Sequence, residues 1–218
     1  VFMLADDMGY GDVGCYNAQS KIPTPHMDRL AAEGMRFTDA HSSSSVCTPS
    51  RYGILTGRYC WRTSLKRSVH FNYEPPLIEM SRLTVASMLK TEGYRTACVG
   101  KWHLGLGYSA KEGQVFDFDR PQPWPGGMLP KTEEMKIDFS KPLKGGPITL
   151  GFDLFYGTSA CSTCNVPYGL IEGDRFIEQP TEYYEGKYLE QRSGWKAPGW
   201  NDEQADMLFL KKGVEFIQ

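Results

Sequence analysis

The chain has 218 residues, 40% of them hydrophobic, which is enough to bury a core of domain size and excludes a short peptide-like role. Lysine and arginine (24) nearly balance aspartate and glutamate (26), so no charge field favours nucleic acid or an anionic membrane surface as a partner. No apolar run reaches the roughly 18 residues that a membrane span requires, so we expect none.

The first forty residues predict a strand, a turn and a helix. Residues 1–5 are apolar and are expected to form a buried strand, and a glycine-rich turn follows them. Thr24 is expected to cap a helix that has Pro25 at its first position and ends at Gly34. Residues 35–40 are expected to be extended.

Helices and strands then alternate. Residues 47–55 have a helical pattern closed by Gly57, and an apolar stripe over residues 85–89 predicts a helix that ends at Gly93. A strand is expected over residues 94–99. This βαβ order predicts an α/β fold with a mostly parallel sheet flanked by helices.

Residues 106–150 are rich in proline, glycine and charge, most densely over residues 121–127, which predicts an irregular excursion and not a domain boundary. A short strand is expected over residues 151–156, and Asp202 is expected to cap a final helix. The inward face of that helix is expected to contain Ala205, Leu208, Phe209 and Phe216.

Six cysteines are too sparse for a disulfide-stapled fold, and Cys98 lies inside the apolar strand pattern. The Cys161-x-x-Cys164 pair could form half of a metal site or a redox pair, but no second pair or nearby histidine completes it. We therefore interpret the cysteines as incidental or loop-pinning.

Asp6 and Asp7 follow the first apolar segment, at the kind of strand end where open α/β sheets bind their ligands. Two adjacent carboxylates repel each other unless a cation lies between them, so a hard divalent metal is favoured. The alternative is that one carboxylate caps a turn and the other faces water.

The segment Cys47-Thr48-Pro49-Ser50-Arg51 places a nucleophile and a cation one helical turn apart. Free N–H groups at a helix N-terminus attract an anionic ester, but at roughly 0.3 to 1 kcal/mol they support a metal and do not replace it. The alternative is a buried structural cysteine with its arginine in a surface ion pair.

Lys101 and His103 follow the strand expected over residues 94–99. Residues two apart in an extended chain point the same way, so this ammonium and imidazole can converge on one oxyanion while Trp102 packs behind them. The alternative is a solvated strand terminus. The other histidines are interpreted as cap, loop or surface residues: His26, His41 and His70.

Four motifs occur together and in a fixed order. They are Asp6-Asp7-Met8-Gly9-Tyr10-Gly11-Asp12, Thr24-Pro25-His26-Met27-Asp28-Arg29-Leu30-Ala31, Cys47-Thr48-Pro49-Ser50-Arg51 with Leu55-Thr56-Gly57-Arg58, and Gly100-Lys101-Trp102-His103-Leu104-Gly105. This set resembles the type I sulfatases of the alkaline-phosphatase superfamily. The resemblance is close to about residue 105 and continues weakly through residues 151–153, and its Cys-x-Pro-x-Arg element is specific.

The resemblance implies hydrolysis of an aryl or carbohydrate sulfate monoester, with a sulfated small molecule or glycan as substrate. It implies that a formylglycine-generating or sulfatase-maturing enzyme oxidises Cys47 to formylglycine, that calcium is bound, and that the protein is exported to a periplasmic, extracellular or lysosomal space. The implied catalytic residues are Cys47, Arg51, Lys101 and His103, and the implied metal ligands are Asp6, Asp7 and Cys47.

Calcium takes roughly six to eight oxygen ligands, and this sequence offers two obvious carboxylates. Residues 1–218 are therefore expected to be the N-terminal part of a single sulfatase catalytic domain whose C-terminal part is absent. Two other functions fit the same residues: a phosphodiesterase or phosphonate hydrolase on the same scaffold, and a non-catalytic binding protein in which Cys47 is never modified.

Overall fold

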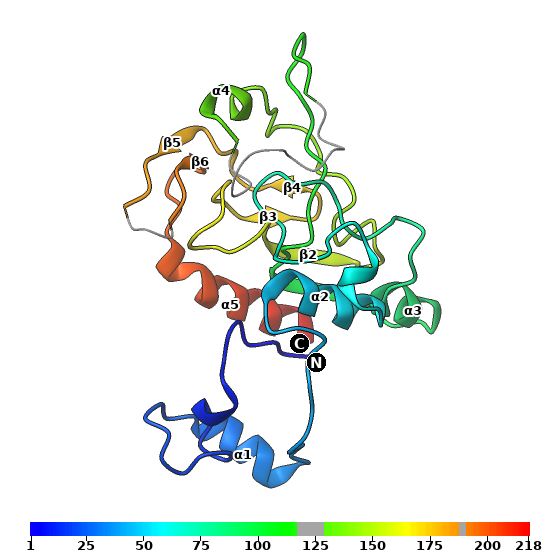
Figure 1. Cartoon of the computed structure of the whole chain (residues 1–218), viewed down its shortest axis with the longest axis vertical. Helices are drawn as coiled ribbons and strands as arrows, with labels where there is room; N and C mark the ends of the chain where they lie inside the picture. Colours follow the sequence, from blue (N-terminus) through cyan, green and yellow to red (C-terminus); the bar gives the residue numbers. More distant parts are fainter. Residues whose placement is uncertain (117–128, 188–190) are drawn as a thin grey trace. The chain divides into compact units, whose positions relative to one another are not determined.

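The computed structural model describes residues 1–116, 129–187 and 191–218. The chain forms two compact units, residues 1–42 and residues 43–218 (Figure 1). The second unit combines helices with a mixed sheet, so the α/β class is confirmed. No helix among the described residues is long and apolar enough to cross a membrane.

The first unit contains a short 3-10 helix, η1 (Tyr10–Asp12), and the helix α1 (Pro25–Glu33). The predicted start and end of α1 are confirmed, but the Thr24 side chain does not cap the helix. Its Oγ1 instead accepts a hydrogen bond of 2.8 Å from the backbone N–H of Gly14. Thr24 therefore ties the preceding turn to the helix.

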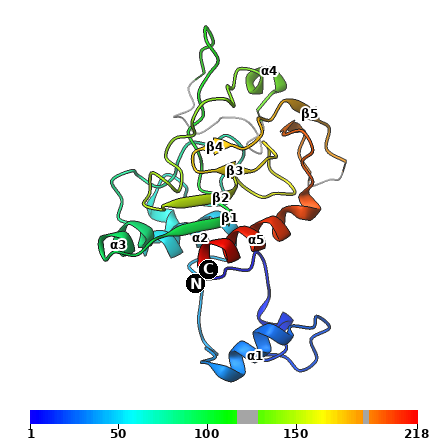
Figure 2. The same ribbon diagram turned by 180° about the vertical axis from the view of Figure 1, so that it is seen from behind.

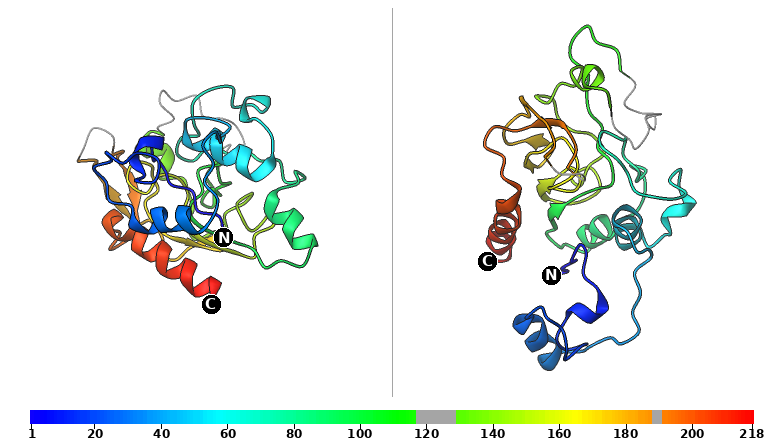
Figure 3. Two further views of the ribbon diagram at one scale, coloured as in Figure 1. Left: turned by 90° about the horizontal axis from the view of Figure 1, so that it is seen from below. Right: turned by 60° about the vertical axis from the view of Figure 1, so that its left-hand side comes forward.

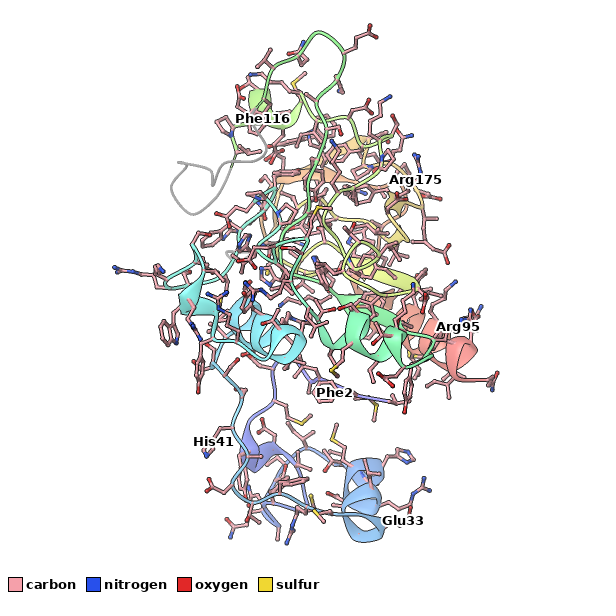
Figure 4. The ribbon with its side chains drawn as sticks, turned by 90° about the vertical axis from the view of Figure 1, so that its right-hand side faces the viewer. Phe2, Glu33, His41, Arg95, Phe116 and Arg175 are labelled. Atoms are coloured by element: carbon pink, nitrogen blue, oxygen red, sulfur yellow. The ribbon has the colours of Figure 1, made fainter. Side chains whose placement is uncertain are left out.

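The predicted strand over residues 1–5 is wrong, because this segment is irregular. Figure 4 labels Phe2, whose side chain is 74% exposed. A strand needs a hydrogen-bonded neighbour, and the described elements of the first unit are all helical. Residues 35–40 likewise contain no strand.

The main sheet of the second unit has the order β1-β2-β3-β4 (Figure 2). The strands are β1 (Ala97–Lys101), β2 (Leu154–Thr158), β3 (Ile171–Glu172) and β4 (Arg175–Phe176). The β1–β2 pair is parallel, and the other two pairs are antiparallel. Both long strands begin and end a few residues later than predicted. A separate antiparallel pair consists of β5 (Glu182–Tyr184) and β6 (Gly194–Lys196).

The helical elements of the second unit include the helices predicted from residues 47, 85 and 202 onward, and two short ones, at residues 60–62 and 131–134, that were not predicted. They are α2 (Cys47–Thr56), η2 (Cys60–Arg62), α3 (Val85–Thr91), α4 (Lys131–Glu134), η4 (Asp202–Gln204) and α5 (Ala205–Ile217). The cap predicted at Asp202 is wrong by one residue. The Asn201 side chain accepts the hydrogen bond from the Glu203 N–H, at 3.0 Å, and η4 leads into α5.

Helix α5 runs alongside β1 and β2 (Figures 2 and 3). The ring of Phe209 contacts that of Tyr156 edge to face, with centroids 6.5 Å apart. The Arg95 guanidinium lies 5.1 Å from the centroid of the Phe216 ring, and Figure 4 shows Arg95 beside the helix. These contacts and the burial of Ala205 agree with the predicted inward face at three of its four residues, and Leu208 is half-buried.

The core lies between α2, the sheet and the loops that follow it. Its largest fully buried side chains include Trp102, Tyr52, Phe155 and Ile78.

The described parts of residues 106–150 are irregular apart from α4, as predicted. Residues 117–128, with the proline-rich run at 121–127, lie outside the described residues.

The close approach of β1 and β2 requires glycine at position 157. Gly157 pairs with Gly100, and a Cβ at position 157 would lie 1.8 Å from the Gly100 carbonyl oxygen. We predict that Gly157→Ala lowers the free energy of unfolding by about 1 to 3 kcal/mol, because the strands must move apart. Urea unfolding measures the change. Gly213→Ala in α5 is the control, since nothing lies within 4 Å of the added atom; equal stability of the two variants would contradict this packing.

Candidate active site

Cys47 is the first residue of α2. The preceding residue, Val46, has an extended backbone (φ −132°, ψ 163°), and Gly57 ends the helix in the left-handed conformation (φ 65°), so the predicted helix is confirmed at both ends. Cys47 is half-buried and forms no disulfide. Its side chain is therefore carried by the first turn of a helix, where backbone N–H groups have no intrahelical partner.

Arg51 lies one turn after Cys47 and connects α2 to the end of β1. Its Nη1 donates a hydrogen bond of 2.5 Å to the carbonyl oxygen of Lys101, the last residue of that strand. The guanidinium is half-buried. This hydrogen bond to a backbone carbonyl holds the guanidinium beside the end of β1.

Thr48 joins three segments through one hydroxyl and was not singled out in the sequence. The side chain is fully buried, its Oγ1 donates to the carbonyl oxygen of His103 at 2.9 Å, and the same oxygen accepts from the backbone N–H of His70 at 3.1 Å. Threonine has both a donor and acceptor lone pairs, so a single side chain satisfies both groups. It thereby fixes the residue next to Cys47 against the loop that carries His103.

His103 is buried in a left-handed backbone conformation, with φ 58°. Its N–H donates to the Ser159 carbonyl oxygen at 2.9 Å, and its Nε2 lies 2.8 Å from the His70 carbonyl oxygen. A carbonyl can only accept, so Nε2 carries the proton and Nδ1 is left as an acceptor. Nδ1 is buried and has no hydrogen-bond partner among the described residues.

Burial lowers the pKa of His103 to about 3, and the positive charge of Lys101 adds to the effect. The imidazole is therefore neutral at pH 7. The extended geometry expected from residue 101 to residue 103 does not continue, because the left-handed backbone interrupts it. Trp102 packs behind as predicted, being 2% exposed and donating from Nε1 to the Gly105 carbonyl oxygen at 3.0 Å.

His70 lies in a loop, as one of the sequence interpretations allowed, but it is not a surface residue. It is 6% exposed, burial lowers its pKa to about 4, and its Nδ1 lies 3.5 Å from Glu74 Oε2. A pocket beside these histidines is lined by residues from three loops. They include His70, Asn72, Glu74, His103, Tyr108 and Ser159. No periodic signal marks residues 70–74 in the sequence, because an irregular loop has no period.

Asp6 and Asp7 belong to the first unit, where both are exposed. Carboxylate oxygens are the donors that calcium prefers, so their chemistry fits the implied metal. Among the described residues, however, no group of three or more histidine, cysteine, aspartate or glutamate side chains gathers closely enough to hold an ion. Cys47, Arg51 and the residues at the end of β1 all belong to the second unit.

A family model described as sulfatase matches residues 1–217. The chain belongs to the sulfatase family. It is 50% identical over 139 residues to an N-acetylgalactosamine-6-O-sulfatase of Bacteroides thetaiotaomicron, covering 64% of this chain and 25% of that protein. It is 46% identical over 107 residues to human arylsulfatase A, covering 49% of this chain and 21% of that protein.

Solved structures agree with this assignment. A structure from work on glycosaminoglycan metabolism by Bacteroides thetaiotaomicron matches with a TM-score of 0.71 and 28% identity, over 97% of this chain and 46% of that one. The PsFucS1 sulfatase from Pseudoalteromonas sp. matches with a TM-score of 0.60 and 25% identity, over 98% of this chain and 39% of that one. The chain thus spans about a quarter of the length of the curated relatives and less than half of these structures.

The Thr48 hydroxyl provides a test of the site that does not depend on activity. We predict that Thr48→Val lowers the free energy of unfolding by about 1 to 3 kcal/mol, because the His70 N–H and the His103 carbonyl lose a buried partner. Hydrogen exchange at the His70 amide should accelerate in the same variant. Thr48→Ser keeps the hydroxyl and should restore protection; an amide equally protected in the valine variant would refute this role.

Proposed function

We propose that the protein hydrolyses sulfate monoesters of carbohydrates, with a formylglycine derived from Cys47 as the nucleophile. The observation that carries the proposal is the Cys-x-Pro-x-Arg segment at the start of α2, with Arg51 bonded to the end of β1. Family membership supports the reaction, and the 50% identity to an N-acetylgalactosamine-6-O-sulfatase supports a sugar sulfate over an aryl sulfate.

The half-buried position of Cys47 in the first helical turn suits this nucleophile, because it leaves one side open to a substrate. When present, formylglycine would supply a hydrated aldehyde, which has two hydroxyl groups on one carbon. One hydroxyl could attack sulfur, and the other would allow the sulfate to be released. The proposal includes a formylglycine-generating or sulfatase-maturing enzyme as a partner, and export to the compartment where sulfated glycans occur.

The cationic side chains neutralise charge on the sulfate group. Lys101, at the end of β1, and Arg51, one turn after Cys47, supply the positive groups that stabilise negative oxygens. Buried His103 differs, because its neutral ring has a protonated Nε2 held by a carbonyl and an acceptor at Nδ1. In this state His103 is suited to accept a hydrogen bond at Nδ1, and its low pKa makes it a poor proton acceptor.

We further propose that Asp6 and Asp7 bind calcium together with further oxygen ligands. The two adjacent carboxylates support it, since a cation between them removes their mutual repulsion. Calcium would contribute positive charge for the sulfate oxygens.

Mass analysis and turnover at Cys47 test the catalytic proposal. We predict that the Cys47 peptide, from protein produced with a maturing enzyme, is lighter than the unmodified peptide by roughly 18 mass units, as thiol-to-aldehyde conversion requires. Cys47→Ala should remain folded and lose multiple turnover of N-acetylgalactosamine 6-sulfate. Cys15→Ser, at another half-buried cysteine, is the control that should retain it.

Each alternative has its own outcome in that experiment. Wild-type turnover by Cys47→Ala would show that Cys47 does not provide the nucleophile. Faster hydrolysis of bis(4-nitrophenyl) phosphate than of any sulfate ester would indicate a phosphodiesterase. An unmodified Cys47 peptide without turnover would indicate a binding protein.

Calorimetry tests the metal proposal separately. We predict that Asp6→Asn and Asp7→Asn each weaken calcium binding by on the order of tenfold or more, because a neutral amide replaces an anionic ligand. Asp39→Asn is the control, since Asp39 is exposed in the same unit and pairs with His41 at 2.7 Å. If Asp6→Asn and Asp7→Asn bind calcium as tightly as the wild type, or if the wild type does not bind calcium, the proposed calcium site is wrong.

A further inference from the structure

The turn after β2 carries two free cysteines, Cys161 and Cys164, both half-buried. The backbone N–H of Asn165 donates to the Cys161 carbonyl oxygen at 3.1 Å and closes the turn. The start of this loop is fixed against β1, because the N–H of Trp102 donates to the Thr158 carbonyl oxygen at 3.0 Å. The two thiols are thus held on one short turn and not on separate mobile segments.

The neighbours of the two sulfur atoms differ. Cys161 Sγ lies 3.2 Å from the Thr163 hydroxyl oxygen, whereas Cys164 Sγ donates to the Asn165 side-chain oxygen at 3.5 Å. Asn165 is buried, and its Nδ2 donates at 2.9 Å to Oδ1 of Asn72, which lines the pocket beside His103. This chain of bonds anchors Cys164 to the pocket wall.

The environment also separates the acidities of the two thiols. The neighbouring Cys164 side chain, the Thr163 hydroxyl and the positive charge of Lys101 lower the pKa of Cys161 despite its burial. The interaction between the two cysteine side chains raises the pKa of Cys164. Cys161 is therefore the more acidic thiol of the pair and Cys164 the one that keeps its proton, as in an attacking and a resolving cysteine.

We propose that Cys161 and Cys164 form a reactive dithiol site that is oxidised reversibly by low-molecular-weight disulfides such as oxidised glutathione. The Cys161 thiolate attacks one sulfur of the disulfide, a new S–S bond forms, and one glutathione thiolate leaves. Cys164 then loses its proton to solvent and attacks Cys161 Sγ, which expels the second glutathione thiolate. The cysteine pair loses two electrons and the glutathione disulfide gains them, so the exchange balances.

The ordinary alternative is a loop that merely contains two cysteines, as the sequence alone suggested. Spacing cannot exclude it, since the C-x-x-C pattern carries no information on the groups around the sulfurs. The structure identifies these groups as the Thr163 hydroxyl, the anchored Asn165 side chain and the nearby Lys101, and they favour a reactive pair over an inert one. The inference concerns thiol chemistry and does not rest on the proposed sulfatase activity.

The test equilibrates the reduced protein with buffers of reduced and oxidised glutathione, followed by acid quenching, alkylation and peptide mass analysis. As the proportion of oxidised glutathione rises, we expect the peptide that contains both cysteines to lose its two alkylation sites together. Its mass should fall by that of two hydrogens, and dithiothreitol should restore both sites. Iodoacetamide at pH 6 should modify Cys161 about tenfold faster than an ordinary cysteine, because the larger thiolate fraction outweighs the lower nucleophilicity of a more acidic thiol.

Variants assign the two roles. Cys164→Ser should accumulate a single glutathione adduct at Cys161, since no resolving thiol is present, whereas Cys161→Ser should react slowly and form no disulfide. Thr163→Val should slow alkylation of Cys161 at pH 6, and Cys15→Ser should leave all these readouts unchanged. Independent alkylation of the two cysteines at every glutathione ratio would overturn the proposal, as would a disulfide that excess dithiothreitol cannot open.

Discussion

The parallel pairing of β1 with β2 is the constraint on which the rest of the site depends. Lys101 pairs with Thr158, and the two chains stay together beyond the strands, because the N–H groups of Trp102 and His103 donate to the carbonyls of residues 158 and 159. The His103 backbone, at the end of this continuation, is in the left-handed conformation. Helix α2 is then attached by two side chains that bond to backbone carbonyls, those of residues 101 and 103. The backbone carbonyls of residues 101 and 103 thus set the position of the nucleophile turn through the side chains of Arg51 and Thr48.

Burial at this junction decides which groups carry charge. Desolvation disfavours the charged form of an imidazole, and a neighbouring cation disfavours it further, so the pKa of His103 falls to about 3. The pKa of His70 falls to about 4 because of desolvation alone. The positive charge of the site therefore resides on its lysine and arginine. Both histidines act through hydrogen bonds across the physiological pH range.

Local sequence signals predicted the elements that depend on local chemistry. Helix α2 follows from the residues around Pro49 and from Gly57, which adopts the left-handed conformation that glycine favours. The strand expected over residues 1–5 was wrong because strand formation depends on a partner that its own sequence does not specify. The cap was predicted at Asp202 but is Asn201. Both residue types cap helices well, so only the position of the first turn distinguishes them.

Long-range contacts account for what the sequence could not predict. Thr48 bonds to residues 22 and 55 positions away, so no window of sequence contains its role. The pKa of Cys161 is lowered mainly by its neighbours Cys164 and Thr163, but Lys101, 60 positions earlier in the chain and on the strand paired with β2, adds a long-range contribution. One lysine at a strand end therefore contributes to two chemical environments, that of the buried imidazole and that of the thiolate. A substitution that removes its charge should alter both, and the pKa of Cys161 should rise while that of His103 also rises, because a cation stabilises an anion and destabilises another cation.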